Sequence, residues 1–177
     1  MPIRVFPVAG GASYTNDWHA ARGGGERSHE GNDLFASEGT PLLAVEDGEV
    51  RFGNDPRGGR IASLRASDGL RYYYAHLSGF QGSARPVRAG EVIGYLGRTG
   101  NAAHTAPHLH FGVYQSDGSA TNPFPMLQGA AVRRAGGAGG RSVLVPLLIA
   151  SAIGIGYWIS TSPTEARRLG RRWGILT

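Results

Sequence analysis

The chain of 177 residues contains no cysteine and no lysine. Without cysteine it can form neither a disulfide nor a cysteine-ligated zinc finger, so any zinc ion must be held by histidine, aspartate or glutamate. Residues 1–128 also lack any extended stretch with helical periodicity, which argues against a helical domain there. The N-terminus lacks an apolar run of about 7–15 residues, and we therefore expect no signal peptide.

All 18 basic residues are arginine, and they are distributed unevenly. Residues 1–128 hold 11 Arg against 12 Asp and Glu, a net charge of −1, whereas residues 129–177 hold seven Arg against one Glu, a net charge of +6. The two parts add up to the overall +5. A nucleic-acid-binding module carries its basic residues on the folded domain. The distribution therefore predicts no nucleic-acid partner.

Short β-type runs separated by turn residues fill residues 1–128. Asp47-Gly48 predicts a hairpin between strands at 42–45 and 49–52, and Asp68-Gly69 predicts another between strands at 60–66 and 70–76. Further strands are expected at 92–96 and 109–114. Hairpins at this spacing predict an all-β domain over residues 1–128, built as one antiparallel sheet or a small sandwich.

Three segments are expected to follow this domain. Residues 129–141 are rich in glycine and predict a flexible linker. Residues 142–162 are uncharged and mostly apolar, and the charge-free stretch continues to residue 164. As a helix it would reach roughly 34 Å, enough to cross a bilayer core of ~30 Å. We therefore expect a single-pass C-terminal membrane anchor at 142–162, followed by a basic tail at 163–177.

Small residues four apart within the predicted span would allow two such helices to pack closely. They give a candidate helix–helix oligomer contact through Ala150, Gly154, Ala152 and Gly156.

Histidines with metal-ligand character occur in three places: His29-Glu30-Gly31-Asn32-Asp33, Tyr74-Ala75-His76-Leu77 and Pro107-His108-Leu109-His110-Phe111. Two residues apart on a strand, His108 and His110 share one face, and Leu109 points to the other. On an extended strand, His29 and Asp33 would lie ~13 Å apart. The chain must therefore bend between them if both bind one ion, and Gly31 makes such a bend easy.

These side chains predict a hydrolytic zinc centre. Zinc binds imidazole nitrogen and carboxylate oxygen, and a catalytic zinc keeps one position open for water. His29, Asp33 and one histidine of the His108/His110 pair would supply three ligands and lower the pKa of the water. His76 and the remaining histidine could then move protons or hold the oxyanion. His19 and His104 have no comparable context and are interpreted as ordinary histidines.

Taken in order, these motifs resemble the M23 (lysostaphin/LytM-type) zinc metallopeptidases. The segments Gly39-Thr40-Pro41 and Gly97-Arg98-Thr99-Gly100 are also similar to family motifs, and the resemblance runs from about Phe6 to about Leu127. It implies an antiparallel β-sheet with a groove over a zinc ion held by His29, Asp33 and His110. It also implies catalytic roles for His76 and His108, and cleavage of peptide bonds in the stem or cross-bridge peptides of bacterial peptidoglycan.

Two function classes follow from this resemblance and the predicted span. The first is a zinc endopeptidase anchored in a lipid bilayer through residues 142–162 and acting on peptidoglycan. The second is a non-catalytic LytM-like binding or activator module tethered to a membrane; such modules typically lose zinc ligands. A span without an export signal favours a virion-associated lysin that acts during phage entry, held in an internal virion membrane. A bacterial tail-anchored protein is the other interpretation.

Overall fold

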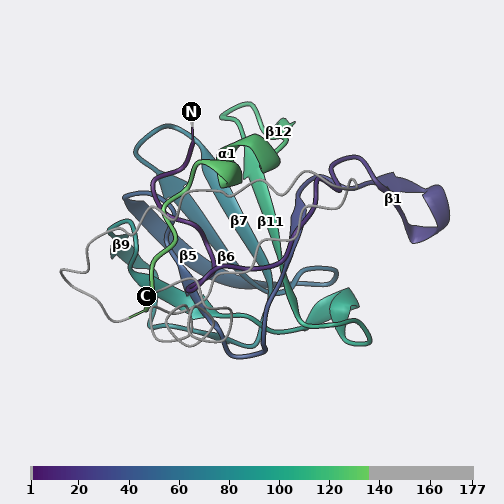
Figure 1. Ribbon diagram of the computed structural model, residues 1–177, viewed down its shortest axis with the longest axis horizontal. Coiled ribbons are helices and arrows are strands. Elements are labelled where there is room, and N and C mark those ends of the chain that lie inside the picture. The colour runs from purple at the N-terminus through teal and green to yellow at the C-terminus, as the bar shows by residue number, and fades with distance from the viewer. Residues whose placement is uncertain (1, 136–177) are drawn as a thin grey trace, which may run out of the picture.

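A computed structural model describes residues 2–135 of the chain (Figure 1). These residues form twelve strands, two 3₁₀ turns and one short α-helix, which confirms the predicted all-β class. The strands are β1 (Ala21–Arg22), β2 (Arg27–Ser28), β3 (Asn32–Phe35), β4 (Pro41–Leu43), β5 (Gly48–Asp55), β6 (Gly59–Ala66), β7 (Arg71–Leu77), β8 (Gly79–Phe80), β9 (Arg85–Val87), β10 (Val92–Tyr95), β11 (His108–Tyr114) and β12 (Ala120–Thr121). The 3₁₀ turns are η1 (Gly23–Gly25) and η2 (Gly100–Ala102), and the helix is α1 (Phe124–Gln128).

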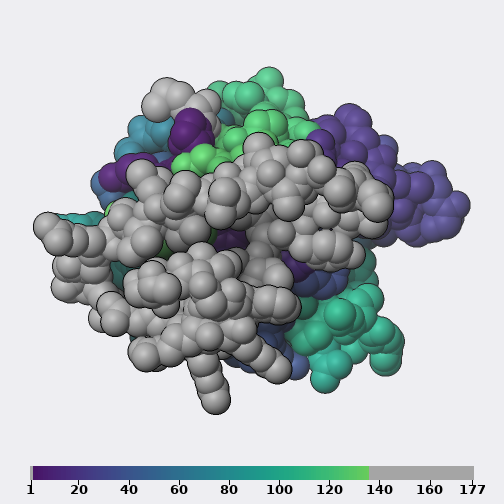
Figure 2. Space-filling model, in the orientation of Figure 1, coloured from purple at the N-terminus to yellow at the C-terminus, as the bar shows by residue number. Residues whose placement is uncertain are grey.

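The large sheet is antiparallel and has seven strands. Six of them follow the order β12-β11-β7-β6-β5-β9, and β3 pairs with the part of β11 that β12 leaves open. A smaller sheet has the order β4-β10-β8, and β1 pairs only with β2. The β1–β2 hairpin stands out from the body of the molecule at one edge (Figures 1 and 2).

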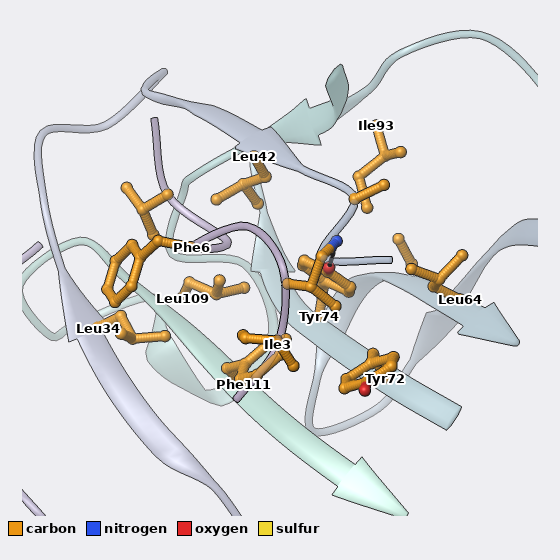
Figure 3. Packing of buried hydrophobic residues seen from close by; sticks show 14 of the residues in the cluster. Ile3, Phe6, Leu34, Leu42, Leu64, Tyr72, Tyr74, Ile93, Leu109 and Phe111 are labelled. Carbon is orange, nitrogen blue, oxygen red and sulfur yellow. Dashed lines mark hydrogen bonds between the residues drawn. The ribbon is translucent and has the colours of Figure 1, made fainter. Parts of the chain in front are cut away.

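One hydrophobic core joins the two sheets. The large sheet contributes Leu64, Tyr72, Tyr74 and Phe111, and the small sheet contributes Leu42 and Ile93 (Figure 3). The N-terminal segment packs into the same cluster through Ile3, Phe6 and Val8. Alternation along β11 places Leu109 and Phe111 in this core and leaves His108 and His110 on the opposite face, as the spacing predicted.

The two predicted hairpins had different outcomes. The hairpin at Asp68-Gly69 is confirmed, because β6 and β7 pair up to Arg65 and Arg71, and Gly69 has a φ of 86°. The hairpin at Asp47-Gly48 is wrong, because β4 pairs with β10 while β5 pairs with β6 and β9. Asp47 instead accepts a hydrogen bond from the Ala89 amide and pairs with Arg4. Gly48 gives β5 room to approach the Arg65 carbonyl.

The chain stays attached to the domain beyond the predicted boundary at residue 128. The Phe6 amide donates to the Ala131 carbonyl at 3.0 Å, and the Gly10 amide donates to the Arg133 carbonyl at 2.9 Å. The start of the predicted linker at 129–141 therefore packs on the N-terminal segment.

The rest of that linker, the predicted membrane helix at 142–162 with its small-residue contact, and the tail at 163–177 lie outside the described residues. Within residues 2–135, no helix has both the length and the apolar content that crossing a membrane requires.

Tyr74 connects the two sheets by hydrogen bonds as well as by packing. Its buried hydroxyl donates to the Leu43 carbonyl at 3.0 Å and accepts from the Val45 amide at 3.1 Å. Tyr74→Phe leaves both backbone groups without a partner, and we expect it to lower the free energy of unfolding by about 1–3 kcal/mol. Urea denaturation measures this. Tyr95→Phe, which removes an exposed hydroxyl bonded to Gln81, is the matched control; equal losses in the two variants would contradict the prediction.

Candidate metal centre

The register of β3 and β11 brings Asp33 and His110 together. The two residues are directly opposite each other in the antiparallel pair. Directly opposed side chains on one sheet face lie close enough to interact. The Nδ1 atom of His110 lies 3.2 Å from Oδ1 of Asp33 as a result.

A bulge near the end of β7 brings His76 to the same face. Tyr72 and Tyr74 point into the core, so regular alternation would send His76 there as well. The β6–β7 register shifts between Ala62 and Arg60, and His76 takes a φ of 67°. β-bulges commonly re-aim a side chain in this way beside functional sites. The His76 ring therefore lies 4.9 Å from the His108 ring, measured between centroids.

The predicted bend between His29 and Asp33 is present at Gly31. The reason that glycine is needed there is not the backbone freedom that the sequence suggested. Gly31 has no positive φ. A Cβ atom there would lie 2.6 Å from Cε1 of His110 and 2.7 Å from the Phe111 carbonyl oxygen. Glycine is thus required because the chain passes close to β11, and this close approach delivers His29 to the site.

Three ligand atoms converge on one point. Nε2 of His29 lies 2.8 Å from Nδ1 of His110 and 3.1 Å from Oδ1 of Asp33. Ligand atoms around a tetrahedral zinc ion lie roughly 3.3 Å apart, given bonds of about 2.0–2.1 Å. Two imidazole nitrogens and one carboxylate oxygen are also a ligand set that zinc accepts. The residues present therefore fit a zinc ion.

The electrostatics of the cluster favour a positive charge at this point. Burial lowers the pKa of His29, but hydrogen bonds to Asp17 and Asp33 outweigh it and raise the pKa to about 9. Burial raises the pKa of the Asp33 carboxyl. Hydrogen bonds and charge interactions with His110 and His29 outweigh burial and hold that pKa far below its usual range. A bound cation would be stabilised by the same carboxylates.

A second layer of side chains orients the ligands. Oδ2 of Asp17 lies 3.1 Å from Nδ1 of His29, and Oδ1 of Asp17 accepts a hydrogen bond from the buried Asn32 amide at 2.7 Å. The Nη2 atom of Arg22 lies 2.9 Å from Oδ2 of Asp17 and also 2.9 Å from Oδ2 of Asp33. Carboxylates that hold the far nitrogen of a ligating histidine set its tautomer and orientation. Asp17 and Arg22 therefore complete the candidate centre from outside the ligand set.

His76 and His108 present a free ring nitrogen to the site. Nδ1 of His76 lies 2.9 Å from the Thr99 carbonyl oxygen, and Nδ1 of His108 lies 2.8 Å from the Ala106 carbonyl oxygen. A carbonyl can only accept, so each Nδ1 carries a proton, and Nε2 is the nitrogen that has a lone pair whenever the ring is neutral. Burial lowers the pKa of His76 to about 4, which keeps that ring neutral near pH 7.

All five residues singled out by the sequence meet in this region. His29, Asp33 and His110 form the metal-type group, with His108 and His76 beside it. His19 stacks on Trp18, and His104 is exposed near η2; neither belongs to the ligand group. Sequence reasoning missed Asp17 and Arg22, because neither belongs to a motif with a recognisable ligand spacing.

Asp17→Asn is expected to weaken zinc binding by about 10–100-fold, the usual range for losing a carboxylate behind a histidine ligand. The amide keeps the size of the side chain but loses the charge that holds Nδ1–H of His29. A competition titration against a chromophoric chelator measures the affinity. Asp117→Asn, in an exposed turn away from the site, is the matched control. An unchanged affinity in Asp17→Asn would show that Asp17 does not position His29.

Comparisons with known proteins agree with this geometry. The chain is 36% identical over 136 residues to the L-Ala–D-Glu endopeptidase of Bacillus subtilis, a match that covers 70% of this chain and 42% of that protein. It is 38% identical over 114 residues to the glycyl-glycine endopeptidase ALE-1 of Staphylococcus capitis, covering 58% of this chain and 30% of that protein. The chain thus spans less than half the length of the curated relatives it matches.

Among solved structures, the catalytic domain of lysostaphin from Staphylococcus simulans has the same fold. It superposes with a TM-score of 0.59 at 33% identity, over 66% of this chain and 92% of that domain. The model of peptidase family M23 matches residues 27–123, which is more than half of the chain and includes His29, Asp33, His76, His108 and His110. The chain belongs to peptidase family M23.

Proposed function

We propose that this protein is a zinc-dependent endopeptidase that hydrolyses peptide bonds in bacterial peptidoglycan. The observation that carries the proposal is the convergence of the three ligand atoms beside two imidazoles that each keep a free Nε2. The names of the relatives support the reaction type, since both curated relatives described above are endopeptidases. The non-catalytic alternative is less well supported, because such modules typically lose zinc ligands and the three candidate ligand residues lie together in this chain.

His29, Asp33 and His110 would hold the zinc ion. When bound, the ion would act as a Lewis acid that polarises the substrate carbonyl and lowers the pKa of coordinated water. Arg22 occupies Oδ2 of Asp33, which leaves Oδ1 as the ligand atom. Asp17 holds Nδ1 of His29, which leaves Nε2 facing the same point. The second layer therefore prepares the ligand atoms before any metal arrives.

His76 and His108 are placed to handle the proton of the reaction. A neutral imidazole can accept the proton of the attacking water at Nε2 and later donate it to the leaving amine. The second imidazole can donate a hydrogen bond to the developing oxyanion once it carries a proton. Both rings are anchored through Nδ1 to backbone carbonyls, so each can serve without reorienting. Catalysis by side chains requires that the reacting groups are held in fixed positions, and these two hydrogen bonds hold both rings in place.

The test is release of soluble peptides from purified peptidoglycan by the full chain, with and without a zinc chelator. We expect release that a chelator abolishes and added zinc restores, while a non-chelating isomer of the chelator has no effect. Product masses then identify the cleaved bond. A folded, zinc-loaded chain that releases nothing from several wall types would favour the binding or activator module instead.

We also propose that residues 142–162 tether the domain to a bilayer. The support is the length of the charge-free apolar stretch. Flotation of the full chain with liposomes, compared with a chain that ends at residue 141, tests the tether; equal flotation would overturn it. The virion location stays a prediction, which mass spectrometry of purified particles against uninfected cell envelopes would test.

A further inference from the structure

A cavity of about 380 Å³ opens beside the candidate metal centre. His29 and His110 are part of its lining, so the cavity is continuous with the metal centre. The rest of the lining includes Arg27, from the β1–β2 hairpin that stands out at the edge of the molecule (Figure 2), and Arg57, from the turn between β5 and β6. A substrate group in this cavity would therefore lie within a few residues of the bond being cut.

The cavity carries excess positive charge. Arg22, Arg27 and Arg57 line it, against a single carboxylate, that of Glu30. Arg22 is already paired with Asp17 and Asp33. Among residues 2–135, the ion pairs made by arginine involve Arg4, Arg22, Arg51, Arg85 and Arg98, and leave Arg27 and Arg57 without a carboxylate partner. Two exposed guanidinium groups are thus available to a ligand.

Guanidinium groups bind carboxylates especially well. A planar fork of N–H donors matches a carboxylate in a bidentate pair, and the charge of arginine persists at any physiological pH. In peptidoglycan, a γ-linked D-glutamate of the stem peptide keeps a free α-carboxylate, whereas a glycine cross-bridge carries no side-chain charge. The family relatives include both an L-Ala–D-Glu and a glycyl-glycine endopeptidase, so family membership leaves this choice open.

We propose that this cavity binds a carboxylate of the substrate peptide, and that Arg27 and Arg57 thereby select acidic stem peptides over uncharged glycine cross-bridges. The inference rests on the proposed endopeptidase function. Arg27 and Arg57 come from segments 30 positions apart in the chain, and both border the same cavity as two of the proposed zinc ligands. A carboxylate held between them would fix the register of the peptide across the centre.

The experiment compares two synthetic stem peptides that differ only in the α-carboxylate or α-carboxamide of the γ-linked D-glutamate. With the full chain, we expect kcat/KM for the acidic peptide to exceed kcat/KM for the amide peptide by about tenfold. This is the lower end of the range for a hydrogen bond to a charged group, because both arginines are exposed to solvent. In Arg27→Gln and Arg57→Gln, the acid-to-amide ratio should fall towards one, mainly through a higher KM for the acidic peptide. Arg65→Gln is the matched control, since Arg65 is exposed on β6 and does not line the cavity.

The outcomes separate this inference from the proposed function. Equal cleavage of both peptides, or a ratio that Arg27→Gln and Arg57→Gln leave unchanged, would overturn the inference while the endopeptidase function stands. If neither peptide is cleaved, calorimetric binding of the same two peptides decides: preference for the acidic peptide that both variants remove supports the cavity assignment without the activity. Equal binding of the two peptides would overturn it.

Discussion

Replacing His29, Asp33 or His110 by alanine is expected to remove both zinc binding and peptide cleavage. These three residues provide the atoms that converge within 4.8 Å of one another. Losing a residue that only orients a ligand already costs about 10–100-fold in metal affinity, so losing a ligand itself should cost more. A two-ligand remnant also leaves nothing to hold the ion in the geometry that keeps a position open for water. Activity should fall to the background of the assay.

Metal content after gel filtration, measured by elemental analysis, is the direct readout for these variants. Circular dichroism establishes that each variant is folded, so that loss of zinc is not confused with unfolding. His104→Ala is the matched control, because His104 is exposed and lies outside the ligand group. A His110→Ala chain that kept one zinc ion per molecule would contradict the assignment of that histidine as a ligand.

The part of the site that depends on strand periodicity could be predicted from the sequence. His108 and His110 are two apart after a proline, and this local pattern is sufficient to place them on one face of a strand. The pairing of His29 with Asp33 could be predicted only as a requirement that the chain bend. The structure supplies the reason for Gly31, which is the close approach of His110 and the Phe111 carbonyl. Such an approach involves residues some 80 positions apart in the chain and leaves no local signal.

The features that sequence reasoning missed are set by long-range packing. Asp47-Gly48 has the composition of a hairpin turn. The Asp47 carboxylate instead accepts a hydrogen bond from the Ala89 amide and pairs with Arg4, and β5 pairs with β6 rather than with β4. The sequence predicted His76 as a site residue, but it did not predict the bulge and the left-handed backbone in β7 that turn this side chain to the site face. Asp17 reaches His29 from a segment without regular secondary structure. For Asp47 and Asp17, the deciding contact joins segments that no periodicity or turn rule connects. At His76, the bulge breaks the two-residue alternation on which strand prediction depends.

His108→Ala and His76→Asn are expected to lower kcat by about 10²–10⁴-fold while leaving zinc bound, the range for losing a positioned proton-transfer group. Neither histidine belongs to the group of three converging ligand atoms. Asparagine is chosen at position 76 because His76 has a φ of 67°, a conformation that asparagine tolerates better than alanine. It keeps a polar side chain but has no nitrogen that can accept a proton. Steady-state kinetics on a stem peptide, with zinc content measured on the same samples, provides both readouts.

The zinc measurement decides the division of roles within the His108/His110 pair. Nε2 of His108 lies 4.0 Å from Oδ1 of Asp33, whereas Nδ1 of His110 lies 3.2 Å from the same atom. The ion therefore should stay with His110 when His108 is removed and leave when His110 is removed. The reverse pattern would exchange ligand and catalyst between the two positions. Loss of zinc from both variants would mean that the pair acts as one ligand set, and proton transfer would then rest on His76 alone.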